Sequence, residues 1–174
     1  MLKGLLPRLL PIDLKIHFIV FEGKQHLEKQ LPKRLKNWKK PDCLFVVLRD
    51  QDSGNCISIR KNLVTICADS GKPETLIRIA IHELESWYLG DLAAVDAGLN
   101  INRLSKLQNK AKYRNPDKLA NPSQELKRIT SNRYKKVSGS RAIGPHLSLY
   151  ENCSYSFHKF ISGIKTLYPK NSPK

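Results

Sequence analysis

The segment LFVVLRDQDSGNC, residues 44–56, carries the strongest structural signal in the chain. It begins with a continuous apolar run over 44–48, which is typical of a central parallel strand buried on both faces. This run leads directly to Asp50 and Asp52 in a polar loop. In open α/β sheets, ligands bind beyond the carboxyl ends of the strands. The segment therefore predicts an α/β fold with a polar site at this strand end.

Strand-like and helix-like segments alternate on both sides of this segment, as they do in βαβ units. The apolar residues of 75–81 also fit the start of a long helix, but a strand there preserves the alternation. The expected elements are a short helical end over 2–10, a strand over 15–21, a basic amphipathic helix over 25–38, a strand over 44–48, a helix over 56–68, a strand over 75–81, a helix over 84–92 and a final amphipathic helix over 154–167.

The charge of the 174-residue chain is strongly positive, with a formal net charge of +16. Such a balance favours a polyanionic partner, either nucleic acid or an anionic membrane, and nucleic acid is the partner that we expect. The stretch 103–141 has twelve lysines and arginines against two acids, which gives it a net charge of +10. Its expected nucleic-acid-binding residues are Lys110, Lys112, Arg114, Arg133, Lys135, Lys136 and Arg141. A solvated basic face is the alternative.

The composition changes near residue 99, where Gly, Pro, Asn and Ser become frequent. We therefore predict a metal-binding core over 1–98 and a basic C-terminal extension over 99–174, made of loops and short helices. No apolar run reaches the length of a membrane span, so no membrane partner is expected. The four cysteines form no CxxC pair and nothing requires disulfides, which favours a cytoplasmic location.

The candidate catalytic residues are four carboxylates. Asp50 and Asp52 reach the same small volume if the strand ends in a loop, and carboxylate oxygens without Cys or His partners suit Mg²⁺ or Mn²⁺. A solvated acidic turn is the alternative. Glu85 is expected near the interior whether 75–81 is strand or helix, and Glu83 either borders the same site or interacts with a helix dipole. Asp50, Asp52 and Glu85 are the expected metal ligands.

Other catalytic motifs fit less well. His82 and Glu83 begin an HExxH-like pattern, but Ser86 stands where the second histidine belongs, which excludes the zinc metalloprotease motif.

The acids and the basic stretch together predict a metal-dependent nuclease, because divalent ions activate water and cations hold the phosphates. Two alternatives remain open: a non-catalytic subunit that binds nucleic acid or docks on an ATPase, and a phosphatase or phosphotransfer enzyme for small substrates.

Four segments together resemble a known bacterial family. They are LPKRL, VVLRDQDSGNC, RIAIHELESWYLGDL and YKKVSGSRAIGPHLSL with SYSFHKF, and they resemble the domain of unknown function four-two-seven-six over nearly the whole chain. That family is regarded as Toprim-like and related to the nuclease part of overcoming-lysogenization-defect enzymes. The resemblance implies a Rossmann-like Toprim parallel sheet flanked by helices, with magnesium at Asp50, Asp52 and Glu85. It also implies a role in phage defence beside an AAA-type ATPase.

The chain departs from the Toprim pattern at its beginning. Toprim domains carry a glutamate at the end of a first strand, and this strand is expected to be missing here, with LLPRLLP over 5–11 as the end of the helix that follows it. Only one helix fits between Glu22 and Asp50, so Glu22 lies on the wrong strand to replace that glutamate. Glu22 is therefore expected to be a loop residue beside Gly23.

Overall fold

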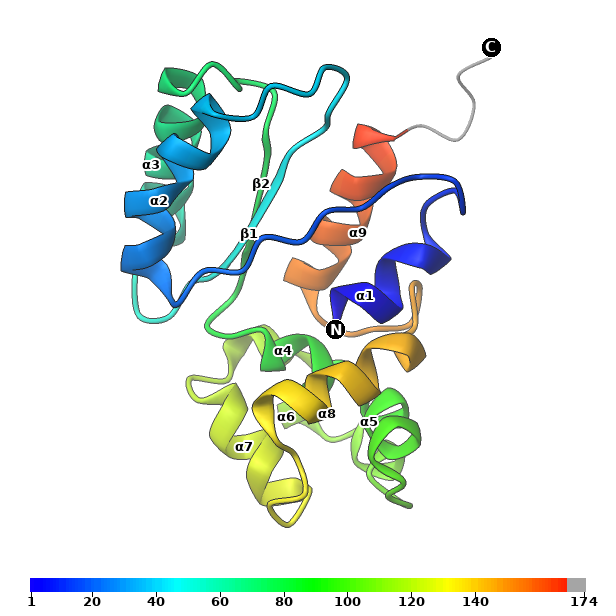
Figure 1. Cartoon of the computed structure of the whole chain (residues 1–174). Helices are drawn as coiled ribbons and strands as arrows, with labels where there is room; N and C mark the ends of the chain where they lie inside the picture. Colours follow the sequence, from blue (N-terminus) through cyan, green and yellow to red (C-terminus); the bar gives the residue numbers. More distant parts are fainter. Residues whose placement is uncertain (169–174) are drawn as a thin grey trace. The chain divides into compact units, whose positions relative to one another are not determined.

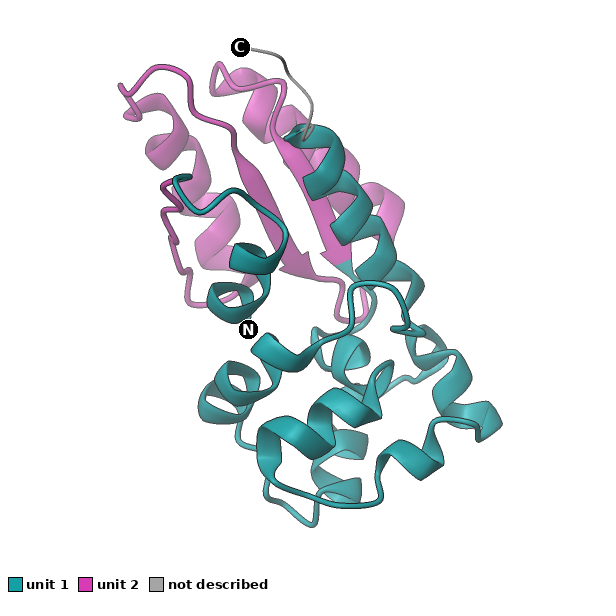
Figure 2. Ribbon diagram, turned by 90° about the vertical axis from the view of Figure 1, so that its right-hand side faces the viewer, with its two compact units in different colours: residues 1–14, 80–174 teal, residues 15–79 magenta. Residues whose placement is uncertain are grey.

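The computed structural model describes residues 1–168 of the chain and shows a mixed α/β protein with a two-stranded parallel sheet (Figure 1). The chain forms two compact units (Figure 2). One unit is Lys15–Ile79, and the other combines Met1–Leu14 with Ala80–Lys174. The boundary between 98 and 99 that the sequence predicts does not coincide with this division. The predicted division of the chain into a metal-binding core over 1–98 and a basic extension over 99–174 stays a prediction.

The unit Lys15–Ile79 holds the sheet and two helices. Its elements in chain order are α2 (Lys24–Lys36), β1 (Val46–Asp50), α3 (Cys56–Asp69) and β2 (Leu76–Ala80), whose last residue belongs to the other unit. The two strands run parallel, and the link between them includes the Leu76 amide donating to the Phe45 carbonyl at 2.9 Å. The expected strand over 75–81 is confirmed.

Both helices of this unit pack on the strand pair through one apolar cluster. In α2 the buried leucines recur every fourth residue, which places them on one face of the helix. The buried members of the cluster are Leu27, Leu31 and Leu35 from α2, Val47 from β1, Leu63 and Cys67 from α3, and Ile77 from β2. The helices expected over 25–38 and 56–68 are thus confirmed.

Two expectations about the sheet are wrong. Residues 15–21 have a strand-like composition, yet within the described chain they form no strand, and Ile19 and Val20 are exposed. A strand needs a backbone partner, which β propensity alone does not supply. The first strand is not buried on both faces either, since Val46 is 40% exposed. The described sheet contains β1 and β2 only, so one edge of β1 lacks a neighbouring strand.

The other unit is helical and its connections are short. Its longer elements are α1 (Leu2–Leu5), α4 (Glu85–Leu89), α5 (Leu92–Leu99), α6 (Ala111–Arg114), α7 (Pro122–Ile129), α8 (Lys136–Ile143) and α9 (Tyr155–Leu167). Single 3-10 turns lie at Leu6–Arg8, Ser105–Leu107, Pro116–Lys118 and Gly144–His146. Of the extension expected over 99–174, residues 99–168 form short helices, 3-10 turns and loops followed by α9, and its role as a separate basic extension stays a prediction.

The core of this helical unit surrounds Trp87, which is fully buried. Its ring packs against Phe157 and Phe160 of α9, with ring centroids 5.3 and 5.1 Å away. The indole Nε1 donates to the Ser156 hydroxyl at 2.8 Å, so the polar edge of the ring is satisfied. The apolar face expected for the last helix is confirmed, because Phe157, Phe160, Ile161 and Ile164 are all buried.

The helix expected over 84–92 is divided at Gly90. A Cβ at Gly90 would lie 2.3 Å from Asn152 Oδ1, so only glycine allows this close approach. The Asp91 side chain then caps α5 by accepting from the Ala94 amide at 3.0 Å. This break leaves α4 as a helix of one turn that begins at Glu85.

Candidate functional site

The two aspartates lie at the carboxyl end of β1, although the strand ends two residues later than expected and includes Asp50. Asp50 is the last residue of the strand and is half-buried, and Asp52 lies in the following turn, where it is exposed. The turn is closed by Gln51, whose Nε2 donates to the Gly54 carbonyl at 2.9 Å. Asn55 then caps α3 by accepting from the Ser58 amide at 3.0 Å. Strand, turn and helix therefore follow without a break and hold both aspartates at the strand's carboxyl end.

Cations accompany the acids in this unit. Lys24 Nζ lies 3.2 Å from Asp52 Oδ2, and both side chains are about half exposed, at 50% and 42%. Arg49 forms an ion pair with Glu28 of α2. An exposed ion pair such as Lys24 with Asp52 contributes about 1 kcal/mol or less, so Asp52 can exchange its partner at little cost.

A left-handed residue follows each strand at the same offset. Asp52 lies two positions after the end of β1 and His82 two positions after the end of β2, and both have a φ of 55°. Such a conformation costs about 1 kcal/mol or more for a residue with a side chain, and it is frequent at functional sites. The turns after β1 and β2 therefore share a left-handed residue at this position, and neither uses glycine there.

Glu85 is the most deeply buried acid of the predicted set, at 1% exposure. Its Oε1 accepts a hydrogen bond of 2.8 Å from the hydroxyl of Tyr134, which also lies 3.0 Å from Ser140 Oγ. Burial, and next the charge of Glu85, raises the pKa of Tyr134 well above its usual value, so the phenol remains a donor. Within residues 1–168, Glu85 Oε2 has no hydrogen-bond partner.

Glu83 has a different environment. It is half-buried, and its Oε2 accepts a hydrogen bond of 2.8 Å from the backbone amide of Ser123, in the first turn of α7. A carboxylate at this position satisfies an otherwise unpaired amide and interacts favourably with the helix dipole. The alternative expected for Glu83 was an interaction with the dipole of the helix that follows it, whereas the observed contact is with α7 and occupies one of the two carboxylate oxygens.

The four acids are divided between the two units. Asp50 and Asp52 belong to Lys15–Ile79, and Glu83 and Glu85 belong to the helical unit. In the part of the chain that the structure describes, no three His, Cys, Asp or Glu side chains form a group that could hold a metal ion. Each unit contributes two of the four acids, so the joint metal site at Asp50, Asp52 and Glu85 stays a prediction.

A comparison with family models shows the family to which this chain belongs. The model described as "Domain of unknown function (DUF4276)" matches residues 2–165. The chain belongs to the DUF4276 family. The searches of the curated proteins and of the solved structures found no match. Among residues 1–168 of this DUF4276 protein, no helix combines the length and the apolar character that crossing a membrane requires.

The basic residues predicted to contact nucleic acid all lie on the helical unit of the DUF4276 chain, and all are exposed. Three lie in or beside α6, namely Lys110, Lys112 and Arg114, and the other four are Arg133, Lys135, Lys136 and Arg141 in or before α8. Lys112 has an acidic partner, because its Nζ lies 2.9 Å from Glu125 Oε2. Exposure is what phosphate contacts require, and the binding itself stays a prediction.

Two polar features of the DUF4276 chain were missed by the sequence reasoning. Tyr134 stands within the basic stretch, and nothing in its neighbourhood in sequence links it to Glu85, 49 positions away. Glu125 accepts hydrogen bonds from Tyr113 at 2.6 Å and from Arg128 at 2.8 Å. The Arg128 contact was open to prediction, because residues three apart on a helix are neighbours.

Proposed function

We propose that the DUF4276 chain is a divalent-metal-dependent nuclease with a Toprim-like core, in which Asp50, Asp52 and Glu85 bind Mg²⁺ or Mn²⁺. The observation that carries the proposal is the unpartnered Oε2 of the buried Glu85. A buried carboxylate oxygen without a partner costs about 1–3 kcal/mol. A metal cation is a partner that removes this cost.

The chemistry of the donor set fits such an ion. The candidate ligands are carboxylates, which are the ligands that Mg²⁺ and Mn²⁺ prefer. Among residues 1–168, Asp52 is held by an exposed ion pair with Lys24, and Glu83 retains one oxygen outside its hydrogen bond with Ser123. When bound, a divalent ion supplies an activated water and offsets the charge of the leaving oxygen.

The chain's own residues then have separate roles in this proposal. Asp50 and Asp52 hold the ion at the end of β1, and Tyr134 orients Glu85 by donating to Oε1, which leaves Oε2 for the ion. Glu83 completes the catalytic set, and the exposed cations of the helical unit bind the phosphates of the substrate through salt-sensitive contacts. The family resemblance adds a Rossmann-like parallel sheet, a role in phage defence and an AAA-type ATPase partner to the proposal.

The test is cleavage of labelled single-stranded and double-stranded DNA and RNA by the purified full chain, with Mg²⁺, Mn²⁺ or a chelator. We expect cleavage that depends on the metal and that Asp50→Ala abolishes. Asp69→Ala is the matched control, because Asp69 is an exposed aspartate of the same unit outside the predicted site. Cleavage that survives in Asp50→Ala or in the chelator contradicts the proposal.

A second function is favoured by the ion pair between Lys24 and Asp52, which already neutralises one of the predicted ligands. In this proposal the chain is a non-catalytic subunit that binds nucleic acid or docks on an ATPase. It predicts binding that weakens with salt and survives chelation, together with no cleavage by any metal. The cleavage assay above therefore separates the two proposals directly.

A further inference from the structure

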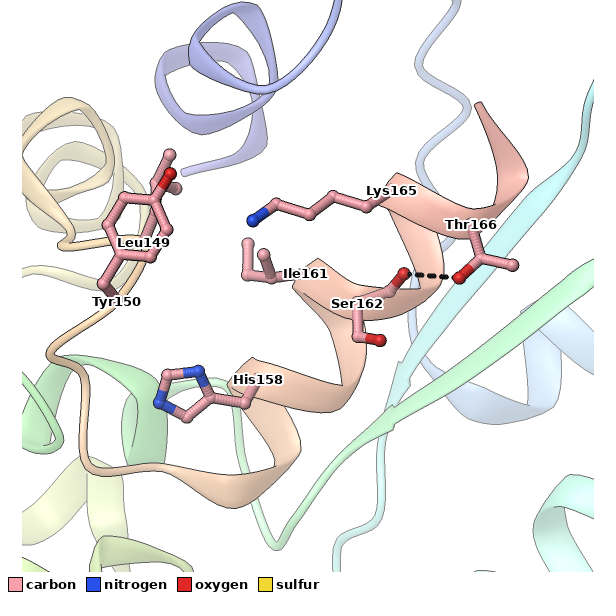
Figure 3. A pocket seen from close by; sticks show the side chains of 7 residues that line it. All are labelled: Leu149, Tyr150, His158, Ile161, Ser162, Lys165 and Thr166. Atoms are coloured by element: carbon pink, nitrogen blue, oxygen red, sulfur yellow. Dashed lines mark hydrogen bonds between the residues drawn. The ribbon is translucent and has the colours of Figure 1, made fainter. Parts of the chain in front are cut away.

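A hollow of about 510 Å³ lies beside α9 in the helical unit (Figure 3). This volume is within the range of small-molecule sites, about 300–1,000 Å³. One wall comes from α9, where His158, Ile161, Ser162 and Lys165 recur at spacings of three and four residues and so share one side of the helix. The opposite wall comes from the loop that carries Tyr150.

The lining combines an aromatic face with a positive charge. Lys165 Nζ lies over the ring of Tyr150, 5.0 Å from its centroid, and Tyr150 is 77% exposed. Helix α9 contains no acidic residue, and in the part of the chain that the structure describes Lys165 forms no ion pair with a carboxylate. The charge of Lys165 is therefore available to an anion bound beside the ammonium group, above the ring of Tyr150.

Polar groups complete the lining. Ser162 is exposed and presents a hydroxyl, which can donate to a phosphate oxygen. His158 is held through Nε2, which donates to the Asn152 carbonyl, so in the neutral ring the other nitrogen, Nδ1, is an acceptor. The hollow thus offers a cation, a hydroxyl donor and a ring acceptor around an aromatic face.

We propose that this hollow binds one nucleotide, with the base stacked on Tyr150 and the phosphate held by Lys165 and Ser162. Stacking on an aromatic side chain beside a cation is how proteins bind unpaired nucleotides without reading their sequence. The ligand is a free mononucleotide or one unpaired nucleotide of a single strand. A duplex does not fit this description, because its bases are stacked on one another.

This proposal goes beyond the nuclease proposal, because the binding needs neither a metal ion nor cleavage. It also differs from general attraction of a polyanion to a basic chain. The same helix offers a matched pair for that comparison: Lys159 Nζ lies 5.0 Å from the ring of Tyr155, which is 65% exposed. That pair does not line the hollow.

The experiment is a fluorescence anisotropy titration of the full chain with labelled short oligothymidylate in the presence of EDTA. We expect Tyr150→Ala and Lys165→Gln each to weaken binding about tenfold, the effect of losing one base stack or one phosphate contact. Tyr155→Ala and Lys159→Gln should stay within about twofold of the wild type, since they remove the same groups outside the hollow. Unchanged thermal unfolding of the variants shows that each has folded.

The competitors identify the ligand. If thymidine monophosphate displaces the oligonucleotide, a free nucleotide is sufficient for binding. If the oligonucleotide binds tightly and thymidine monophosphate does not displace it, a strand is needed. Both results support the site. Equal losses in the two pairs, or no loss in either, overturn the proposal. The proposal is also overturned if inorganic phosphate competes as strongly as the mononucleotide does. It is overturned likewise if Tyr150→Ala weakens the binding of a duplex as much as it weakens the binding of the single strand. Because EDTA is present throughout, a chain that fails to cleave nucleic acid can still pass this test.

Discussion

Replacing Glu85 with methionine should stabilise the metal-free chain, although Glu85 lies at the start of a buried helix. The carboxylate is 1% exposed, Oε1 accepts from Tyr134 and Oε2 has no partner within the described residues. Methionine has a similar size and adapts its shape to its surroundings, so it fills the space without the unpaired oxygen. Tyr134 keeps a polar neighbour in this variant, because its hydroxyl also lies 3.0 Å from Ser140 Oγ.

The expected size of the effect follows from these contacts. Replacing a buried ion pair with apolar residues of similar volume is often neutral or stabilising, and an unpaired buried carboxylate oxygen such as Oε2 costs about 1–3 kcal/mol. The lost hydrogen bond from Tyr134 offsets part of this, which leaves a gain of about 1–2 kcal/mol. For a chain of this length, about 1 kcal/mol corresponds to about 2–4 °C in Tm. We therefore expect the Glu85→Met variant to melt about 2–8 °C above the wild type.

A divalent ion should reverse the order if Glu85 is a ligand. At a metal concentration about a hundred times its Kd, binding stabilises the wild type by about 2.7 kcal/mol, which exceeds the gain of about 1–2 kcal/mol expected for the variant, and the variant lacks this stabilisation. Thermal unfolding in EDTA and with increasing Mg²⁺ or Mn²⁺ measures both effects. Glu83→Gln is the control: it weakens the charged acceptor of the Ser123 amide, so its Tm in EDTA should fall rather than rise.

Two outcomes would refute this reasoning. A Tm of Glu85→Met below that of the wild type in EDTA would mean that the buried carboxylate is satisfied as it stands. An equal rise in Tm on adding metal to the wild type and to the variant would mean that Glu85 does not bind the ion. The first outcome removes the observation that carries the nuclease proposal, and the second removes Glu85 from the metal site.

Two further predictions concern the stability of the helical unit. Hydrogen bonds from Arg128, and then from Tyr113, lower the pKa of Glu125 to about 2 despite its burial. The contribution of Glu125 to the free energy of unfolding is therefore complete above the usual carboxyl pKa, and it is lost as pH falls from about 4.5 towards 2. Urea unfolding should therefore show a lower stability at pH 3 than at pH 6, and Glu125→Gln should reduce this difference by about 1 kcal/mol. An equal difference in the wild type and the variant would contradict the role of Glu125. Gly90→Ala should lower stability by about 2 kcal/mol or more, because its Cβ would lie 2.3 Å from Asn152 Oδ1, and a Tm within about 2 °C of the wild type would contradict this contact.

Features that depend on a few consecutive residues could be predicted from the sequence. The apolar stripe of α2 follows from leucines at every fourth position, because the helix period is a local property. Asp50 and Asp52 were assigned to a strand end because the apolar run before them has the length of a strand. A position of Glu85 near the interior was also expected from the sequence, as a residue just past a strand end if 75–81 is a strand and as a neighbour of the apolar stripe if it is a helix, and Glu85 is 1% exposed.

Features that depend on distant partners could not be predicted in this way. Residues 15–21 have the composition of a strand, but no described strand pairs with them. The helix expected over 84–92 ends at Gly90, where Asn152 packs closely from 62 positions along the chain, and Asp91 then leaves the helical conformation. Propensity describes one segment at a time, so it contains no information about what that segment will meet.

The candidate sites divide in the same way. The residue types and their order along the chain determined which side chains can bind metal ions and phosphates, since that depends on composition and local spacing. Only the tertiary structure decided that Tyr134 donates to Glu85, and that Lys165 lies over Tyr150. The reason is physical: an atom's partners are set by packing, and packing brings together residues that the sequence keeps far apart.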